Sequence, residues 1–437
     1  MKPDITPQQA RRIKSQLMNS PVAPGGLSSV INVGTDAILN VLEERYFLRD
    51  LADGISCFKY VEGDYGSGKT QFINCLTKRA HKQNIATSVV SIGQECPFSS
   101  PLAIFRNVMV SFVPPDADEH IFEGHGIESL FQSYVRAELR KLGITPGDSV
   151  PDNVRHQIER PFASAWVGAP DAQMAGALAG LGKVLTGIEC GAAVAVADQE
   201  LMQWVRGDSV RSNNLKQRYG LYEPARDETA FRRLKTVVNF LRERLNYRGF
   251  LIAFDEGTRV NAFRRGTAKQ RQAIENMLTM INQNAEGDFG GVMFLYAATP
   301  DFRADVIQTY IALKDRIGAV AFNPGRPMTP LINLDDQNSD ETLRELGMCL
   351  LDVFSQADGV SWDLDLQRAN MNSLIDGQKR QLGYPRSVPP RYFVFYWCRF
   401  LEEQQLRQRA LTVEEAMQYV QSNNLPDSET ANAAEAQ

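Results

Sequence analysis

Short apolar runs alternate with helical patterns along the chain up to about residue 330. Five runs have the length and composition of buried strands: residues 55–61, 86–92, 249–254, 292–298 and the shorter 319–322. Segments with helical periodicity separate them, including 101–112 and 267–283. Apolar strands that alternate with helices form parallel sheets covered on both faces. The pattern therefore predicts an α/β fold.

One interval between these strands is too long for an ordinary crossover. About 135 residues before the run at 249–254 show almost no strand pattern. Apolar positions recur there with helical spacing at 127–142 and 229–245, and the Ala/Gly-rich stretch 174–197 is typical of close-packed helices. We therefore expect a helical insertion at about residues 113–245.

The two ends of the chain have different patterns. Thr6 and Pro7 form the cap and first position of an opening helix, which apolar residues continue to position 17. After Pro330 the alternation ends and only helices are expected, at residues 342–354, 364–381, 392–408 and 413–421. The predicted organisation is N-terminal helices and linker (1–50), an α/β core (51–330), a helical lid (331–426) and a polar, disordered tail (427–437).

Composition narrows the function classes. Among 437 residues, 43% are hydrophobic and 23% are charged, and the net charge of -5 excludes nucleic-acid binding through bulk charge while leaving local basic patches open. The six cysteines lie far apart without a C-x-x-C pair, which excludes a zinc knot and a disulfide framework. The N-terminal residues do not resemble a leader and no stretch is apolar enough to span a membrane. A cytoplasmic protein is expected.

The strongest motif is Gly63-Asp64-Tyr65-Gly66-Ser67-Gly68-Lys69-Thr70, which matches G-x-x-x-x-G-K-[ST] between a predicted strand and a helix. In such a loop the glycines let backbone N–H groups point toward phosphates, and the helix N-terminus adds partial positive charge. We expect Lys69 to reach the β and γ phosphates and the Thr70 hydroxyl to bind Mg²⁺. The predicted cofactors are therefore ATP and Mg²⁺.

A second element fits the same site. The apolar run that begins at Phe250 ends in two acids, Asp255 and Glu256. Taken alone, Asp255 could equally cap a helix; together with the phosphate-binding loop, a magnesium ligand is favoured. Glu256 would then orient and polarise the attacking water, which predicts hydrolysis rather than transfer to another substrate.

Further residues indicate the branch of nucleotide enzymes. The base-reading Asn-Lys-x-Asp of GTPases and the Leu-Ser-Gly-Gly-Gln of ABC ATPases are absent from the sequence, so ATP is favoured and the order of motifs resembles the AAA+ superfamily. By that resemblance Thr299 stands at the first sensor, Arg316 at the arginine finger and Arg386 at the second sensor in the lid. Thr299 could instead cap a helix, Arg316 could form a surface ion pair, and Arg386 could be structural. An arginine finger supplied by a neighbour implies an oligomer.

Along nearly its whole length the chain resembles the BREX ATP-binding proteins, most closely the BrxD type. The resemblance is carried by residues 58–106 with the phosphate-binding loop and Glu95-Cys96-Pro97-Phe98, by Asp255-Glu256, and by Ala312-Leu313-Lys314-Asp315-Arg316. It implies a bacterial cytoplasmic ATPase of an anti-phage defence system that marks self DNA by methylation and blocks replication of foreign DNA. The implied partners are other BREX proteins and DNA.

One basic segment is a candidate DNA contact. Between Arg259 and Arg271 the chain has five basic residues and no acid: Arg259, Arg264, Arg265, Lys269 and Arg271. A solvated helix start or ion pairs between subunits would explain the segment equally well. Two functions stay open: an ATPase that remodels a DNA-bound defence complex, and a nucleotide-switched adaptor with slow hydrolysis that controls assembly.

Overall fold

The computed structural model describes residues 5–115, 126–144, 150–185, 199–255, 266–285 and 289–423. The chain divides into two compact units. The first unit consists of residues 1–39, 62–75 and 333–437, and the second of residues 40–61 and 76–332. No described helix is long and apolar enough to cross a membrane. The polar tail predicted at 427–437 lies outside the described residues.

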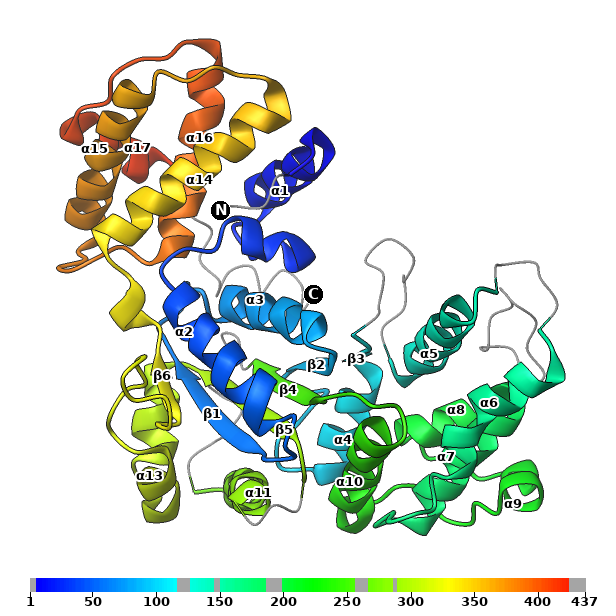
Figure 1. The fold of residues 1–437 in the computed structure, drawn as a ribbon. Helices are drawn as coiled ribbons and strands as arrows, with labels where there is room; N and C mark the ends of the chain where they lie inside the picture. Colours follow the sequence, from blue (N-terminus) through cyan, green and yellow to red (C-terminus); the bar gives the residue numbers. More distant parts are fainter. Residues whose placement is uncertain are drawn as a thin grey trace. The chain divides into compact units, whose positions relative to one another are not determined.

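A six-stranded sheet organises the second unit (Figure 1). Its strands are β1 (Cys57–Glu62), β2 (Ile85–Ser91), β3 (Phe112–Val113), β4 (Gly249–Asp255), β5 (Val292–Ala298) and β6 (Leu331–Asn333), in the order β3-β2-β4-β5-β1-β6. Strands β2, β4 and β5 pair in parallel, and β3 adds an antiparallel edge. Every residue of β4 and β5 is buried, as continuous apolar strands in a parallel sheet require. The α/β prediction is confirmed.

The strand predicted at residues 319–322 is wrong. This segment is irregular, and the sixth strand is β6, which the prediction of helices alone after Pro330 misses. Prolines at 324, 327 and 330 lack the N–H that a sheet ladder needs, so the chain turns after Phe322 instead of continuing as a strand. The Phe322 N–H donates one hydrogen bond to the Leu331 carbonyl, 2.6 Å. The apolar residues Leu331 and Ile332, both buried, then form the edge strand.

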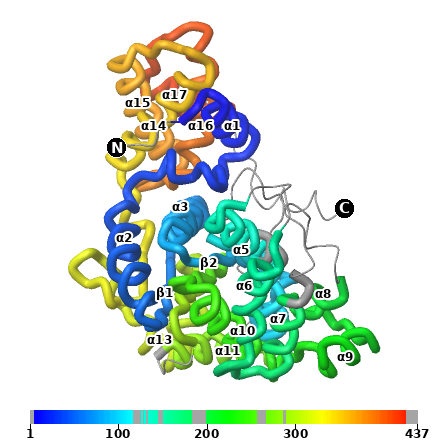
Figure 2. Tube along the Cα trace, turned by 45° about the vertical axis from the view of Figure 1, so that its right-hand side comes forward, coloured from blue at the N-terminus to red at the C-terminus, as the bar shows by residue number. Residues whose placement is uncertain are grey.

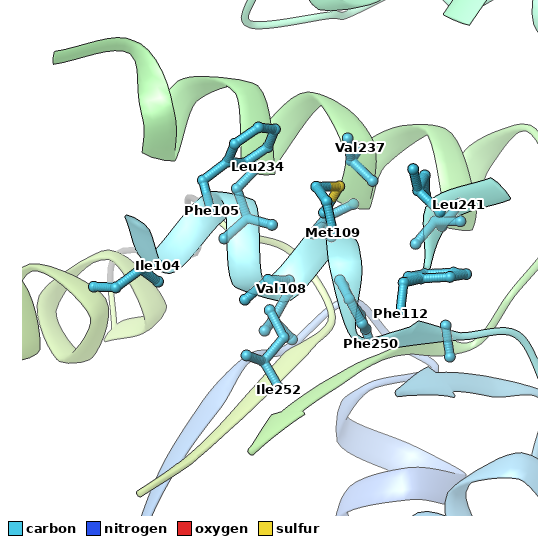
Figure 3. Packing of buried hydrophobic residues seen from close by; sticks show 14 of the residues in the cluster. Ile104, Phe105, Val108, Met109, Phe112, Leu234, Val237, Leu241, Phe250 and Ile252 are labelled. Carbon is cyan, nitrogen blue, oxygen red and sulfur yellow. The ribbon is translucent and has the colours of Figure 1, made fainter. Parts of the chain in front are cut away.

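Helix α4 (Pro101–Val110) carries much of the packing between sheet and insertion. Ser100 caps it with its side chain, and Pro101 occupies its first position. Figure 3 shows α4 between strand β4 and helix α10 (Asp227–Glu243), with apolar side chains from all three elements meeting. Those labelled are Ile104, Phe105, Val108, Met109, Phe112, Leu234, Val237, Leu241, Phe250 and Ile252.

Between β3 and β4 the described residues form helices, as the sequence pattern predicts. These are α5 (Ile127–Lys141), α6 (Asp152–Ala163), α7 (Ala172–Leu185), α8 (Gln199–Arg206), α9 (Asn213–Tyr219) and α10. Helices α6 and α7 lie side by side (Figure 2). A Cβ at Gly182 would overlap the Phe162 side chain, so the glycine permits this close packing. Residues 186–197 of the Ala/Gly-rich stretch lie outside the described residues.

The remaining elements of the second unit surround the sheet. They are a π-helical turn (Leu42–Asp50) that continues α2 (Asp36–Val41), most of α3 (Lys69–Lys82), α11 (Ala268–Ala285), α12 (Pro300–Phe302), a π-turn (Arg303–Ile307) and α13 (Ile311–Ile317).

The first unit has its own helical core, made by α14 (Asp340–Asp358), α15 (Leu364–Leu382), α16 (Pro390–Leu406), α17 (Val413–Ser422) and α1 (Pro7–Asn19). The predicted Thr6 cap of α1 is confirmed and forms a full capping box with Gln9. Ala10, Ile13 and Leu17 of α1 pack against α14 and α16, which explains why the N-terminus belongs to this unit (Figure 1). Two short 3-10 helices complete it, Gly25–Val30 and Asp335–Gln337.

The fold predicts an acid sensitivity at His81 in the second unit. Burial lowers the pKa of His81 from 6.5 to about 4, and its Nε2 lies 2.8 Å from the Thr87 hydroxyl. The unfolded chain therefore binds a proton more readily, so this contribution to stability is complete above pH 6.5 and is lost as pH falls toward 4. At pH 5 the expected loss is about 2 kcal/mol. Urea unfolding at pH 7 and pH 5 should show a smaller pH dependence in His81→Gln; an equal dependence would contradict the assignment.

Candidate nucleotide-binding site

The loop Gly63–Gly68 joins the end of β1 at Glu62 to the start of α3 at Lys69. Gly66 and Gly68 adopt positive φ angles of 82° and 101°, which other residues rarely tolerate. A Cβ at Gly63 would overlap the Ser67 hydroxyl, so this position also requires glycine. The strand, loop and helix expected from the motif are therefore present.

Lys69 folds inward over its own loop. Its side chain is buried, and Nζ donates hydrogen bonds to the carbonyls of Gly63 (2.6 Å) and Asp64 (3.0 Å). Backbone carbonyls carry no net charge, whereas a phosphate is an anion that an ammonium group binds more strongly. The loop thus holds the cation in place before an anion arrives. Thr70 follows in the first turn of α3 and is exposed.

Asp335 contacts the loop from the turn that follows β6. Its carboxylate accepts a hydrogen bond from the Asp64 N–H, at 2.9 Å to Oδ2 and 3.2 Å to Oδ1. Burial raises the pKa of Asp335, while the hydrogen bond from Asp64 and the charge of Lys69 oppose that shift. The sequence analysis missed this residue. Its signal was the doublet Asp335-Asp336 after an apolar stretch, the same pattern that singled out Asp255-Glu256.

Arg391, in the first turn of α16, also contacts the loop. Its N–H donates to the Gly66 carbonyl at 3.2 Å, and its guanidinium lies 4.7 Å from the centre of the Tyr65 ring. A Cβ at Gly66 would lie 2.9 Å from the Arg391 Cβ, so glycine is needed for this approach as well as for the turn. Sequence reasoning missed Arg391 too. Pro389-Pro390 marks the helix start just before it.

Two buried polar atoms at this site have no hydrogen-bond partner among the described residues: the Ser67 hydroxyl Oγ and the Arg391 Nε. Buried donors without partners are costly, and in native proteins they commonly await a ligand or water. A hydroxyl and a guanidinium N–H are both donors suited to phosphate oxygens. Together with the Lys69 ammonium, they make the residues present fit a nucleotide phosphate chain.

The two predicted acids after β4 belong to the second unit. Asp255 ends β4, is 8% exposed and pairs in register with Ser91 of β2 and Ala297 of β5. Its carboxylate and the Thr70 hydroxyl are hard oxygen ligands, the type that Mg²⁺ prefers. Glu256 lies outside the described residues.

The predicted sensor and finger residues also have defined positions in the second unit. Thr299 is half-buried at the N-cap position of α12, but its side chain makes no capping hydrogen bond. Arg316 is exposed in the last turn of α13, where Nε donates to the Asn282 side-chain oxygen at 2.8 Å and Nη1 to the Ala312 carbonyl at 3.1 Å. Its partner is thus an amide rather than the acid of a surface ion pair.

The predicted second sensor, Arg386, lies exposed on the connection between α15 and α16 in the first unit. The arginine that the structure brings to the phosphate-binding loop is Arg391, five positions later. Of the predicted loop residues, 63–69 and the side chains just described therefore gather in one place with two residues that the motif did not include, Asp335 and Arg391.

The family model for the BREX system ATP-binding protein BrxC/D matches residues 5–418. The match covers almost the entire chain, so the protein belongs to this family, and the resemblance noted from its motifs is confirmed. No curated protein and no solved structure matches the chain. The family description names ATP as the ligand, in keeping with a loop built to receive phosphates.

Proposed function

We propose that this BREX ATP-binding protein hydrolyses ATP, as an AAA+ type ATPase with a helical lid. The observation that carries the proposal is the loop itself, with the Lys69 ammonium held inside it and two buried donors, Ser67 Oγ and Arg391 Nε, available to an anion. A site that only recognised phosphate would need no more than this. Hydrolysis also requires a metal ion and an activated water.

The residues for those two tasks come from the sequence pattern. Thr70 and Asp255 would hold Mg²⁺, which supplies charge neutralisation between the β and γ phosphates. Glu256 would orient the attacking water and accept its proton. Thr299 would contact the γ-phosphate or that water. Arg316 would stabilise the charge that develops on the γ-phosphate of a neighbouring subunit.

Hydrolysis would serve the remodelling of a DNA-associated defence complex in the cytoplasm. The partners in this proposal are other BREX proteins, further copies of this chain, and DNA bound at the basic segment 259–271. Of that segment's basic residues the structure describes Lys269 and Arg271, both exposed at the start of α11. The alternative is a switched adaptor in which ATP binding controls assembly and hydrolysis is slow. DNA or partner proteins should stimulate a motor and leave a switch unchanged.

Glu256→Gln tests the hydrolytic role. The amide keeps the shape of the side chain but loses the charge that polarises water, so ATP affinity should stay near wild type while single-turnover hydrolysis falls by about a hundredfold or more. Quench-flow with radiolabelled ATP, together with calorimetric affinity, measures both quantities. The exposed Glu243 offers a matched control, since Glu243→Gln should hydrolyse normally. Undiminished hydrolysis in Glu256→Gln would reject the assignment.

Arg386 and Arg391 form a second pair of test and control. Because Arg391 contacts Tyr65 and Gly66 and has a buried donor to offer, Arg391→Ala should weaken ATP binding by about tenfold or more, the effect of one charge-assisted hydrogen bond. Arg386→Ala, at an exposed position, should change affinity less than threefold. Calorimetry on both variants decides between them. The reverse ranking would restore Arg386 as the lid arginine that senses nucleotide.

A further inference from the structure

Three large side chains are exposed at one end of the helical insertion. Trp166 and Val167, on the connection between α6 and α7, are 53% and 64% exposed, and Tyr222, on the connection between α9 and α10, is 65% exposed. Apolar groups of this size are usually buried, and where they are exposed together they commonly mark an interaction site. The chain's other tryptophans are more shielded, and two of them, Trp204 and Trp397, are fully buried.

One turn of α7 holds both connections in place. The Gln173 side chain accepts a hydrogen bond from the Tyr222 N–H at 2.8 Å and donates to the Gly220 carbonyl at 3.4 Å. Three residues later on the same helix face, a Cβ at Gly176 would lie 3.1 Å from the Trp166 ring, so the glycine leaves room for the ring to rest on the helix. The exposed rings are therefore anchored on a rigid element.

The segment beside these rings is basic. Residues 211–226 contain Arg211, Lys216, Arg218 and Arg226 but only one acid, Glu223, for a net charge of +3 in a protein whose total is -5. All four basic residues are exposed. The Arg218 guanidinium lies 5.3 Å from the centre of the Tyr219 ring. Within the described part of the chain, no ion pair joins Arg211, Lys216 or Arg226 to a carboxylate.

We propose that Trp166, Tyr222 and the basic residues of 211–226, here called the aromatic–basic face, bind single-stranded nucleic acid. Cations track the phosphate backbone, and exposed aromatic rings stack on bases. Bases in a duplex already stack on each other, so rings of this kind favour single strands. A protein partner fits less well, because protein interfaces are depleted in lysine and bury their aromatic residues in a contiguous apolar patch. The face lies in the second unit and needs no ATP hydrolysis.

Intrinsic fluorescence and anisotropy test the proposal on the full chain without nucleotide. A labelled oligothymidine of about 20 nucleotides should bind and quench the tryptophan emission. Oligouridine of the same length distinguishes DNA from RNA as the natural strand, and duplex DNA should bind more weakly than either. Raising salt from about 50 to about 200 mM should weaken binding, and Lys216→Ala with Arg226→Ala should reduce the salt slope by about 1.4, or about 0.7 for each charge removed.

Two ring variants give readouts that a general loss of structure would not. Trp166→Ala should weaken binding about 5- to 150-fold, whereas Trp166→Phe should keep most of the affinity and lose the quench. Arg368→Ala, at an exposed lid position, is the control and should bind like wild type. Wild-type affinity in Trp166→Ala with normal circular dichroism would overturn the proposal, as would equal affinity for duplex and single strand. Either result leaves the ATPase proposal untouched, because hydrolysis is measured separately.

Discussion

Lys69→Ala should lower ATP affinity about thirtyfold to several thousandfold. The substitution removes a buried ammonium that the loop already holds with the Gly63 and Asp64 carbonyls. Truncating one partner of a buried, hydrogen-bonded charge pair typically costs about 2 to 5 kcal/mol, which corresponds to that range of affinity. Calorimetry with a slowly hydrolysed ATP analogue measures the effect free of turnover.

Lys82 provides the matched control for this variant. It is the last residue of the same helix and is exposed, so Lys82→Ala should bind the analogue like wild type. Thermal unfolding of Lys69→Ala checks that the loop change leaves the fold intact. Wild-type affinity in a folded Lys69→Ala protein would show that the nucleotide phosphates bind elsewhere.

Arg316→Ala should lower ATP hydrolysis by about three orders of magnitude if the residue acts on a neighbour's ATP, since an arginine supplied in trans has this effect or more. Within its own chain Arg316 is exposed and bonded only to neutral oxygens, on Asn282 and Ala312. Exchanging those contacts for a phosphate is favourable, because a charged acceptor binds guanidinium more strongly. Lys314→Ala, an exposed position on the same helix, should leave hydrolysis unchanged.

A mixing experiment separates a role in trans from a local one. Arg316→Ala subunits keep their own loop, and Lys69→Ala subunits keep a competent arginine, so the mixture should regain hydrolysis that neither variant shows alone. Native mass spectrometry reports whether the two variants assemble together. An inactive mixture of co-assembled variants would rule out the trans role, and so would normal hydrolysis by Arg316→Ala alone.

The parts of the fold that the sequence predicts well are those set by local pattern. Strands β4 and β5 are buried at every position, so their uninterrupted apolar runs identify them. The capping box at Thr6 and the glycines at 66 and 68 likewise follow from backbone geometry within a few residues. Strand β6 has three residues, too few to show a period, and its place at the sheet edge depends on tertiary pairing.

The candidate site divides in the same way. The motif predicts the loop and Lys69 because the residues that shape a phosphate-binding loop are adjacent in sequence. Asp335 and Arg391 reach that loop from about 270 and 325 positions away, so no local pattern could pair them with it. The Gly-Tyr-Pro-Arg pattern drew attention to Arg386, yet the helix starts later, after Pro389, and this places Arg391 at the loop.

The central claim is that the phosphate-binding loop of this protein hydrolyses ATP with Mg²⁺. Phosphate release in a single turnover, with protein in excess over radiolabelled ATP, tests it most directly. The account predicts complete conversion to ADP by the wild type with Mg²⁺, loss of conversion when EDTA removes the metal, and no conversion by Lys69→Ala. ATP that stays bound and intact in the wild type with Mg²⁺, alone and with DNA present, would contradict the claim and favour the switched adaptor.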